Sequence, residues 1–358
     1  MGRWRHLPIV ALALAVIAVH LLTTVAGKPQ YLTQLTMAGY YSLVIVGLTL
    51  LMGYTGQISL GHAGFFAIGG YTSGLLTTYN LYPRNGQLLV SLLQACGLLL
   101  AGKDMYGADL LLVRPWAACG VALLVTIGIA YLVGKPVLKL RGHYLAMATL
   151  GFGTIVYKVV LGSSLVGAAD GISDIPAFPL FAGLAVTGKS ALRTQNYYVA
   201  WGLVLGAMAL LTNLIRSRVG RALRAIHGAE DAANAMGVDT GRYKLQMFVL
   251  SAALAALGGV FLTHYNGGIG PSEASVMKSV RYVAIVAVGG MANLWGALVM
   301  GVLLNFLCLR GSFGSYDDAV FGLILLAIML FAPDGLLRAE FVRRLPGLRR
   351  RLPQRRVP

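Results

Sequence analysis

Charged residues are scarce in this sequence, and that scarcity limits what the chain can be. Asp, Glu, Lys and Arg make up 11% of the 358 residues, whereas hydrophobic residues make up 57%. A soluble domain carries about 25% charged residues. Because one aqueous core cannot hide so much apolar surface, the composition excludes an ordinary soluble domain and predicts a chain that uses lipid as its solvent.

Cysteine is also rare, and no reactive constellation is apparent. Cys96, Cys119 and Cys308 each lie in an apolar run without a CxxC pair, so neither a disulfide framework nor a zinc site is predicted. Such cysteines are typical packing residues. No nucleophile–base pair or metal-ligand set stands out. We therefore expect a protein that is not an enzyme and that binds no cofactor within this chain.

Acidic residues are few, and the resulting charge imbalance has two interpretations. The chain has 12 Asp and Glu against 29 Lys and Arg, a net charge of +17. Such a balance is typical of nucleic-acid-binding proteins. Here, however, the basic residues cluster in short stretches between apolar runs and in the tail, as the positive-inside rule requires. This distribution predicts a membrane topology and no nucleic-acid partner.

Long apolar runs dominate what is present. A membrane span needs about 20 mainly apolar residues, and eleven candidate runs occur, some of them short. They cover residues 8–26, 36–52, 62–79, 86–101, 114–133, 143–161, 197–215, 245–265, 279–291, 293–309 and 318–333. The runs 279–291 and 293–309 form one stretch that Gly289, Gly290 and Asn293 interrupt.

The basic segments fix the number of crossings. The N-terminus, the segment 216–244 and the tail 338–358 are all rich in basic residues and should face the cytoplasm. An even number of spans must then separate each from the next. Parity removes the weakest run, 86–101, and requires a helical pair broken at Gly289–Gly290. The prediction is an all-α, polytopic bundle of ten spans, with a permease domain over 1–337.

The cytoplasmic segment 216–244 contains a short helix with a small-residue face. Glu230 and Asp231 lie near its start, where negative charge is favoured, and Gly237 is a plausible stop. The small face would consist of Ala232, Ala233 and Ala235. Such a helix can dock in a groove of another protein, although an ordinary solvated loop would have a similar composition.

A family resemblance decides between these interpretations. The stretch DAANAMG, residues 231–237, resembles the EAA-xxx-G coupling motif of ABC importer permeases, with Asp231 in place of the usual Glu. Further stretches resemble the branched-chain amino acid permease family, specifically its LivM-type subunit. They are GYTGQISLGHAGFFAIGGYTSGLL (53–76), RGHYLAMATLGFGTIVY (141–157), GAADGIS (167–173), VAVGGMANLWGALVMGVLLN (286–305) and FAPDGL (331–336). The likeness runs from about residue 36 to 337, and residues 80–113 depart from it.

The resemblance implies a type II-like ABC importer permease in the bacterial inner membrane, with both termini cytoplasmic. It implies cytoplasmic ABC ATPase subunits that bind ATP and Mg²⁺, a second, LivH-type permease subunit and a periplasmic substrate-binding protein. Branched-chain or other hydrophobic amino acids are the implied substrates. The close alternative is a urea or short-amide permease. An ion-coupled secondary transporter is a further alternative, although it would usually need mid-membrane acids.

Two glycine-containing interruptions are candidates for the translocation path. Irregular backbone at membrane depth is tolerated where it is buried or lines a cavity, and broken helices bind solutes in transporters. Either segment could instead be a plain tight turn at the cytoplasmic surface. The candidate residues are Gln57, Ser59, Gly61 and His62 in the first interruption, and Gly289 and Gly290 in the second.

Two further features can be explained without a functional role. Lys158 lies within a predicted span, but it is close to the outer end and could extend its ammonium group to the interface. Residues 183–190 fit the phosphate-loop pattern G-x-x-x-x-G-K-S. That loop needs a buried strand before it and a helix after it. Because this stretch is predicted to face outward, we interpret the match as chance.

Overall fold

The computed structural model of the protein describes residues 7–84, 94, 97–103, 109–180, 183–310, 319, 322, 323, 326 and 330. The longer helices are α1 (Leu7–Val25), α2 (Gln30–Thr55), α3 (His62–Thr78), α5 (Pro115–Val137), α6 (His143–Gly162), α7 (Arg193–Arg216), α8 (Arg218–Gly228), α10 (Thr240–Asn266), α11 (Val276–Gly289) and α12 (Leu294–Leu309). The short elements are helix α9 (Glu230–Ala235) and strands β1 (Leu99–Lys103), β2 (Asp109–Val113), β3 (Phe178–Pro179) and β4 (Ala185–Val186).

The predicted helical membrane bundle is confirmed. Six described helices, α1, α2, α5, α6, α7 and α10, are long and apolar enough to cross a bilayer. Helices α3, α11 and α12 are shorter and coincide with three further predicted runs. The tenth predicted span, 318–333, lies almost entirely outside the described residues, and so does the tail 338–358.

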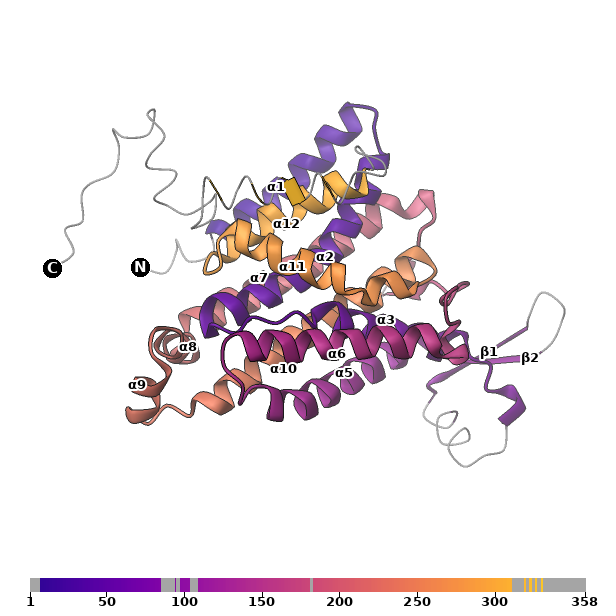
Figure 1. Ribbon diagram of the computed structural model, residues 1–358. Coiled ribbons are helices and arrows are strands. Elements are labelled where there is room, and N and C mark those ends of the chain that lie inside the picture. The colour runs from indigo at the N-terminus through magenta and orange to yellow at the C-terminus, as the bar shows by residue number, and fades with distance from the viewer. Residues whose placement is uncertain are drawn as a thin grey trace.

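The weak run 86–101 ends in a strand rather than a membrane helix. Its last described residues belong to β1, which pairs antiparallel with β2, so that Leu99 lies opposite Val113. This hairpin projects from the end of the bundle opposite to α8 and α9 (Figure 1). The hairpin agrees with leaving this run out of the span count, although most of 86–98 lies outside the described residues.

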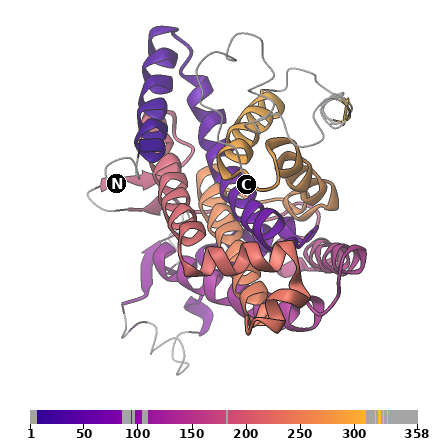
Figure 2. The same cartoon turned by 90° about the vertical axis from the view of Figure 1, so that its left-hand side faces the viewer.

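The connections predicted to be cytoplasmic gather at one end of the bundle, which we call the α9 end. There, Arg141 of the α5–α6 connection donates to Asp231 of α9 at 3.0 Å. The hydroxyl of Tyr54, near the end of α2, donates to the carbonyl of Ala292 between α11 and α12 at 3.0 Å. Figure 2 views this end and shows α8 and α9 lying across it. Helices α11 and α12 are separate, and they form the broken helical pair that an even number of spans required.

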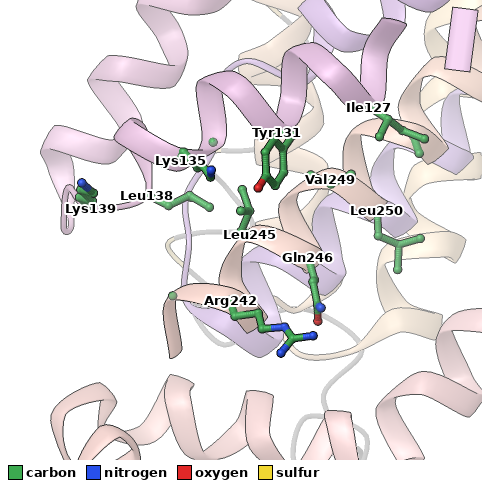
Figure 3. Close-up of a pocket in the computed structure, with 13 residues that line it drawn as sticks. Ile127, Tyr131, Lys135, Leu138, Lys139, Arg242, Leu245, Gln246, Val249 and Leu250 are labelled. Carbon is green, nitrogen blue, oxygen red and sulfur yellow. The ribbon is translucent and has the colours of Figure 1, made fainter. Parts of the chain in front are cut away.

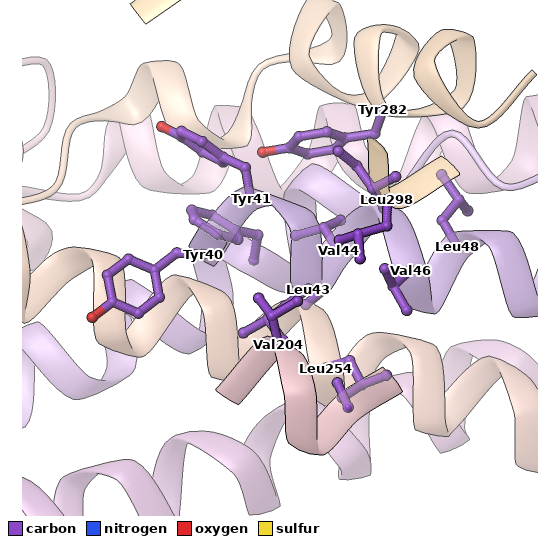
Figure 4. Packing of buried hydrophobic residues seen from close by; sticks show 14 of the residues in the cluster. Tyr40, Tyr41, Leu43, Val44, Val46, Leu48, Val204, Leu254, Tyr282 and Leu298 are labelled. Atoms are coloured by element: carbon purple, nitrogen blue, oxygen red, sulfur yellow. The ribbon is translucent and has the colours of Figure 1, made fainter. Parts of the chain in front are cut away.

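Helix α2 is the centre of the packing. Buried residues make up 89% of the most apolar stretch of α2 but only 11% of that of α1. Helix α1 is therefore peripheral and offers its surface to lipid. Figure 4 shows side chains of α2, including Leu43 and Val46, packed between α7, α10 and α11–α12. The interior of the described bundle is therefore organised around one largely buried helix.

Glycines allow one close helix crossing, between α3 and α10, whereas two glycines of α7 make no close contact. A Cβ at Gly259 of α10 would lie 2.0 Å from the carbonyl oxygen of Phe66 in α3, and one at Gly69 would lie 2.5 Å from that of Ala256. Small residues allow this approach. At Gly202 and Gly206 an added Cβ meets nothing within 4 Å, so this pair makes no close packing contact inside the described chain.

Candidate coupling and translocation sites

Helix α8 anchors the cytoplasmic segment to the bundle. Ser217 caps its first turn by accepting from the Val219 amide at 3.1 Å, a capping preference of serine. Leu223 and Ile226 are buried on one face, while the arginines point to the other. The apolar face fixes α8 against the bundle, so α9, which follows after Ala229, is carried at a defined position.

Helix α9 begins and ends where the sequence predicted. Glu230 and Asp231 occupy its first turn. The helix ends at Ala235, two residues before Gly237. The φ of Gly237 is +80°, a left-handed conformation that favours glycine. The amide of Gly237 donates to the carbonyl of Asn234 at 2.9 Å. The glycine of the DAANAMG stretch therefore has a conformational reason, independent of any partner.

Ion pairs hold α9 between two other parts of the chain. Lys244 of α10, whose side chain is 9% exposed, lies 2.5 Å from Glu230. Arg141 contacts Asp231 at 3.0 Å and Glu230 at 4.0 Å, and the hydrogen bond to Asp231 raises the pKa of Arg141. A displacement of α9 would therefore change contacts with both the α5–α6 connection and α10. Sequence reasoning missed these partners because 90 residues separate Arg141 from Asp231.

The exposed face of α9 differs from the predicted one at a single position. Ala232, Ala235 and Met236 are exposed, and Met236 is 84% accessible. Ala233 is instead 5% exposed and packs toward the protein. The surface that α9 offers to a docking protein is thus formed by two alanines, Met236 and the carboxylate of Asp231.

The connection between α2 and α3 re-enters the bundle. It is not a tight turn at the α9 end, because Gln57, Ser59 and His62 are 3%, 1% and 0% exposed. The amide of Leu60 donates to the hydroxyl of Thr149 at 2.9 Å, and a Cβ at Gly61 would lie 2.7 Å from the Thr149 carbonyl oxygen. This extended segment is therefore packed directly on α6.

Helix α3 starts near the middle of the bundle. His62, its first residue, lies 3.0 Å from the Ser59 hydroxyl and 2.7 Å from that of Ser251. Ser251 is eleven residues beyond the start of α10, about 16 Å along it at 1.5 Å per residue. The structure thus brings Ser59, Gly61 and His62 together at a helix start inside the bundle. Both atoms of the Gln57 amide are buried without a hydrogen-bond partner among the described residues.

The second interruption lies at the α9 end. Gly289 ends α11 and is packed so closely on α12 that an added Cβ would lie 2.5 Å from the Ala297 Cα. Gly290 has a φ of +93°, and Asn293 caps α12 by accepting from the Gly296 amide at 3.1 Å. Gly289 and Gly290 therefore form a helical hairpin turn, distant from the re-entrant start of α3.

A second polar cluster, which the sequence interpretation missed, lies nearer the opposite end. Glu273, in the one-turn 3-10 helix Pro271–Ala274, pairs with Lys278 of α11. Tyr41 of α2 donates to Glu273 at 3.1 Å, and Lys278 donates to the Tyr41 hydroxyl at 3.2 Å. The sequence offered one signal for this cluster. Glu273 and Lys278 are five residues apart beside a predicted span, and acidic residues are rare in this chain, with 12 in all.

Ser279 links the two polar clusters. It follows Lys278 in α11, and its hydroxyl accepts from the amide of Ala63 at 3.1 Å, in the first turn of α3. Ser279 therefore joins the two clusters through chain neighbours: it follows Lys278, which pairs with Glu273, and it accepts from Ala63, which follows His62. We call the residues from Glu273 and Lys278 through Ser279 to His62 and Ser59 the polar line, an arrangement in the described bundle that could receive a polar solute within a membrane.

An apolar groove of about 760 Å³ lies beside the coupling segment, between α5 and α10. Tyr131, Leu245 and Val249 are among its lining residues, and Lys135, Lys139 and Arg242 add positive charge at the α9 end (Figure 3). A groove with apolar walls and basic residues at the cytoplasmic side suits the acyl chain and head group of an anionic lipid. The groove has none of the polar continuity of the polar line.

Lys158 and the phosphate-loop match lie away from both sites. The Lys158 side chain is exposed near the end of α6, with its ammonium 6.0 Å from the Tyr157 ring centre. This position agrees with an ammonium that reaches the interface. The strand within residues 183–190 is the two-residue β4, which pairs with β3 at the end opposite α9. In the described part of the chain, the strand before this stretch is β3, only two residues long, and not the full buried strand that precedes a phosphate loop.

Comparison with known proteins agrees with this geometry. Residues 30–332 match the family described as branched-chain amino acid transport system / permease component. The chain is 31% identical to the high-affinity branched-chain amino acid transport system permease protein LivM of Salmonella typhimurium, over 84% of this chain and 68% of the relative. It is 30% identical to LivM of Escherichia coli, with the same coverage.

The second kind of subunit is a more distant relative. LivH of Salmonella typhimurium is 27% identical, over 86% of this chain and 94% of the relative. No solved structure matches the chain. The matched relatives are transport permease proteins and not enzymes. From the matched family, the LivM likeness and the apolar helices, the chain belongs to the branched-chain amino acid ABC transporter permease family, as a LivM-type multi-pass membrane protein.

Proposed function

We propose that this chain is the transmembrane subunit of a binding-protein-dependent importer that moves branched-chain or other hydrophobic amino acids into the cell. Partner subunits hydrolyse ATP, and this chain hydrolyses nothing. The single observation that carries the proposal is α9, a helix with an exposed small-residue face at the basic end of the bundle. Residues 1–337 would form the permease domain, with 338–358 as a cytoplasmic tail.

The contacts of α9 suggest how ATP hydrolysis reaches the membrane. An ATPase that closes on ATP would displace α9, and the Glu230–Lys244 pair would transmit the displacement to α10. Helix α10 carries Ser251, which contacts His62 at the start of α3. The energy would enter as contacts with the ATPase that differ between outward-open and inward-open states. Gln57, Ser59, Gly61 and His62 would lie on the translocation path, with Gly289 and Gly290 as further candidates at the α9 end of that path.

The proposed assembly has four further kinds of component. We infer two cytoplasmic ABC ATPase subunits, a LivH-type second permease, a periplasmic substrate-binding protein and the surrounding lipid. Likeness to both LivM and LivH supports a pair of related permeases. We infer from the basic loops that the α9 end and both termini would face the cytoplasm, with the chain in the bacterial inner membrane.

The decisive test compares uptake with ATP hydrolysis in the complete reconstituted complex. We expect Asp231→Lys and Gly237→Trp to lower ATP-driven leucine uptake at least about ten-fold, because the first reverses charge on the docking face and the second strains a left-handed turn. Both variants should still insert and assemble, so that hydrolysis continues without transport. Leu165→Lys, at an exposed site of the opposite end, is the control. Normal uptake in both α9 variants would contradict the proposal.

A further inference from the structure

The apolar groove between α5 and α10 runs from the α9 end toward the middle of the bundle. On α10 its lining begins at Gly241 and Arg242 and reaches Ala253, which lies about 16 Å beyond Arg242 along the helix at 1.5 Å per residue. The hydrocarbon of one bilayer leaflet is about 15 Å thick. The groove therefore has the length of one leaflet, and its volume of about 760 Å³ lies within the range of small-molecule sites.

The groove opens on an uncovered apolar face of two membrane-spanning helices. Leu124 and Leu132 of α5 are 69% and 70% exposed, and Ile127, which lines the groove, is 37% exposed. Because α5 and α10 are both long and apolar enough to cross a bilayer, this face meets hydrocarbon and not water. Whatever occupies the inner half of the groove is therefore a component of the membrane.

Positive charge gathers where the groove reaches the α9 end. Lys135 lies in the last turn of α5, Lys139 follows that helix, and Arg242 lies in the first turn of α10 (Figure 3). All three are exposed, and none of them forms an ion pair with another described residue. The Lys135 ammonium lies 4.7 Å from the centre of the Tyr131 ring. The Asp239 carboxylate caps α10 by accepting from the amide of Arg242 at 3.0 Å.

We propose that the groove binds one anionic phospholipid. An acyl chain lies along the apolar wall, and the head-group phosphate accepts hydrogen bonds from Lys135, Lys139 and Arg242. Hydrogen bonds between cationic donors and a phosphate are strong. The lining is apolar inside and cationic at the membrane surface, which is the order of polarity along an anionic lipid. A membrane helix in the groove would need its own acid at this depth to neutralise the cations, and such acids are costly.

The head group joins the two chain segments that hold α9. Lys139 lies two residues before Arg141, and Arg242 lies two residues before Lys244. Arg141 and Lys244 are the residues that pair with the acids of α9. A phosphate held by both Lys139 and Arg242 therefore fixes the α5–α6 connection relative to the start of α10. The bound lipid thus stabilises the position of α9.

A photoactivatable lipid tests the site directly. The full-length chain is reconstituted in phosphatidylcholine vesicles with a trace of phosphatidylglycerol or phosphatidylcholine that carries a diazirine near the end of one acyl chain. Adducts are mapped by peptide mass spectrometry. We expect the phosphatidylglycerol probe to label residues 127–131 and 249–253 at least about five-fold more than the phosphatidylcholine probe. Equal labelling by the two probes would overturn the proposal. Loss of this labelling when the chain is assembled with partner subunits would assign the groove to a protein interface and would also overturn it.

Matched charge variants separate this site from general attraction of lipid to a basic surface. The groove variant combines Lys135→Gln, Lys139→Gln and Arg242→Gln. The control removes three exposed charges of α8, which do not line the groove, by Arg218→Gln, Arg221→Gln and Arg224→Gln. We expect the groove variant to lower labelling by the phosphatidylglycerol probe at least about ten-fold and the control to lower it less than about two-fold. Equal losses would show diffuse electrostatic attraction and would overturn the site.

A filled groove tests the acyl-chain half of the proposal. Ala253→Phe adds a ring at the inner end of the groove and keeps all three cations, whereas Gly202→Phe adds the same ring to α7 where nothing lies within 4 Å. Size-exclusion chromatography checks that each variant is folded. We expect Ala253→Phe to lower phosphatidylglycerol labelling at least about five-fold and Gly202→Phe to leave it unchanged. Unchanged labelling of folded Ala253→Phe would contradict an acyl chain in the groove. Since no readout involves uptake, failure of the importer function would leave these tests intact.

Discussion

The α9 segment and the polar line are held in place by opposite means. The α9 helix is six residues long and largely exposed, and ion pairs to Arg141 and Lys244 tie it to distant parts of the chain. The polar line is buried, and short hydrogen bonds such as that between His62 and Ser251 fix it among closely packed helices. The exposed pair between Arg141 and Asp231 stabilises α9 weakly and the less exposed pair between Lys244 and Glu230 somewhat more, whereas buried polar groups must keep their partners.

This difference distinguishes α9, which can shift on its own, from the packed interior, which must change its arrangement as a whole. A helix held by a few ion pairs can shift with little loss of stability. The interior cannot shift continuously, because packed cores change between discrete arrangements. We therefore expect substitutions at α9 to alter coupling with modest effects on stability. Substitutions along α3 and α10 should alter stability first.

The largest effect is expected at the crossing of α3 and α10. Gly259→Val would place a side chain where even a Cβ lies 2.0 Å from the Phe66 carbonyl oxygen, and such overpacking is strongly destabilising. We expect the yield of folded, detergent-extracted protein to fall at least about ten-fold, measured by size-exclusion chromatography. Gly202→Ala, where nothing lies within 4 Å, is the control. Equal yields for the two variants would contradict the interior packing described here.

A smaller loss is expected inside the polar line. Ser251→Ala removes the hydroxyl 2.7 Å from the His62 Nε2 and leaves a buried ring nitrogen unpaired, at a cost of about 1–3 kcal/mol. The measurement is the apparent melting temperature of the purified protein. The control, Ser272→Ala, changes an exposed serine and should leave the melting temperature unchanged. An unaltered value for Ser251→Ala would show that this contact does not hold the start of α3.

The pair between Glu230 and Lys244 tests the boundary between the two regions. Lys244→Met keeps the length and apolar stem of a side chain that is 9% exposed, while Glu230 loses its nearest cation. Because Glu230 is partly solvated, we expect about 1–2 kcal/mol of destabilisation, less than for a fully buried pair. The loss of leucine uptake should be larger than the loss of folded protein that the lower melting temperature implies. Proportional losses of uptake and stability would argue against a transmitting role.

The smallest effect is expected at Lys158. Its side chain is exposed at the end of α6, and surface substitutions away from special features are nearly neutral. Lys158→Gln should therefore leave both the melting temperature and leucine uptake of the complex unchanged. A clear loss of uptake would assign Lys158 a role in transport.

Much of the fold could be predicted from the chain because lipid imposes simple rules on sequence. Apolar length located the spans, basic loops fixed parity, and parity required the break at Gly289–Gly290 that separates α11 from α12. The stop at Gly237 was also predictable, since a left-handed turn favours glycine. These features depend on local sequence or on one-dimensional charge order.

Features that depend on distant contacts were not predictable. The partners of α9 come from residues 90 and 14 positions away from Asp231 and Glu230, respectively. Gln57, Ser59 and His62 could have lain in a surface turn, and only their packing on α6 and α10 places them inside. Glu273 fell in a predicted outer loop, although it lies in a one-turn helix paired with α11. Sequence spacing gives no signal for the first two sets of contacts, and for Glu273 the one signal was its place five residues before Lys278 beside a predicted span.

Site-specific photocrosslinking at α9 tests the central claim most directly. A photoreactive phenylalanine analogue at Met236, which is 84% exposed, is compared with one at Leu165, 72% exposed at the opposite end. In the native membrane, α9 is predicted to crosslink to an ABC ATPase subunit at position 236, and position 165 to give no such product. Absence of an ATPase adduct at 236, with full assembly of the complex, would contradict the assignment of α9 as the coupling helix.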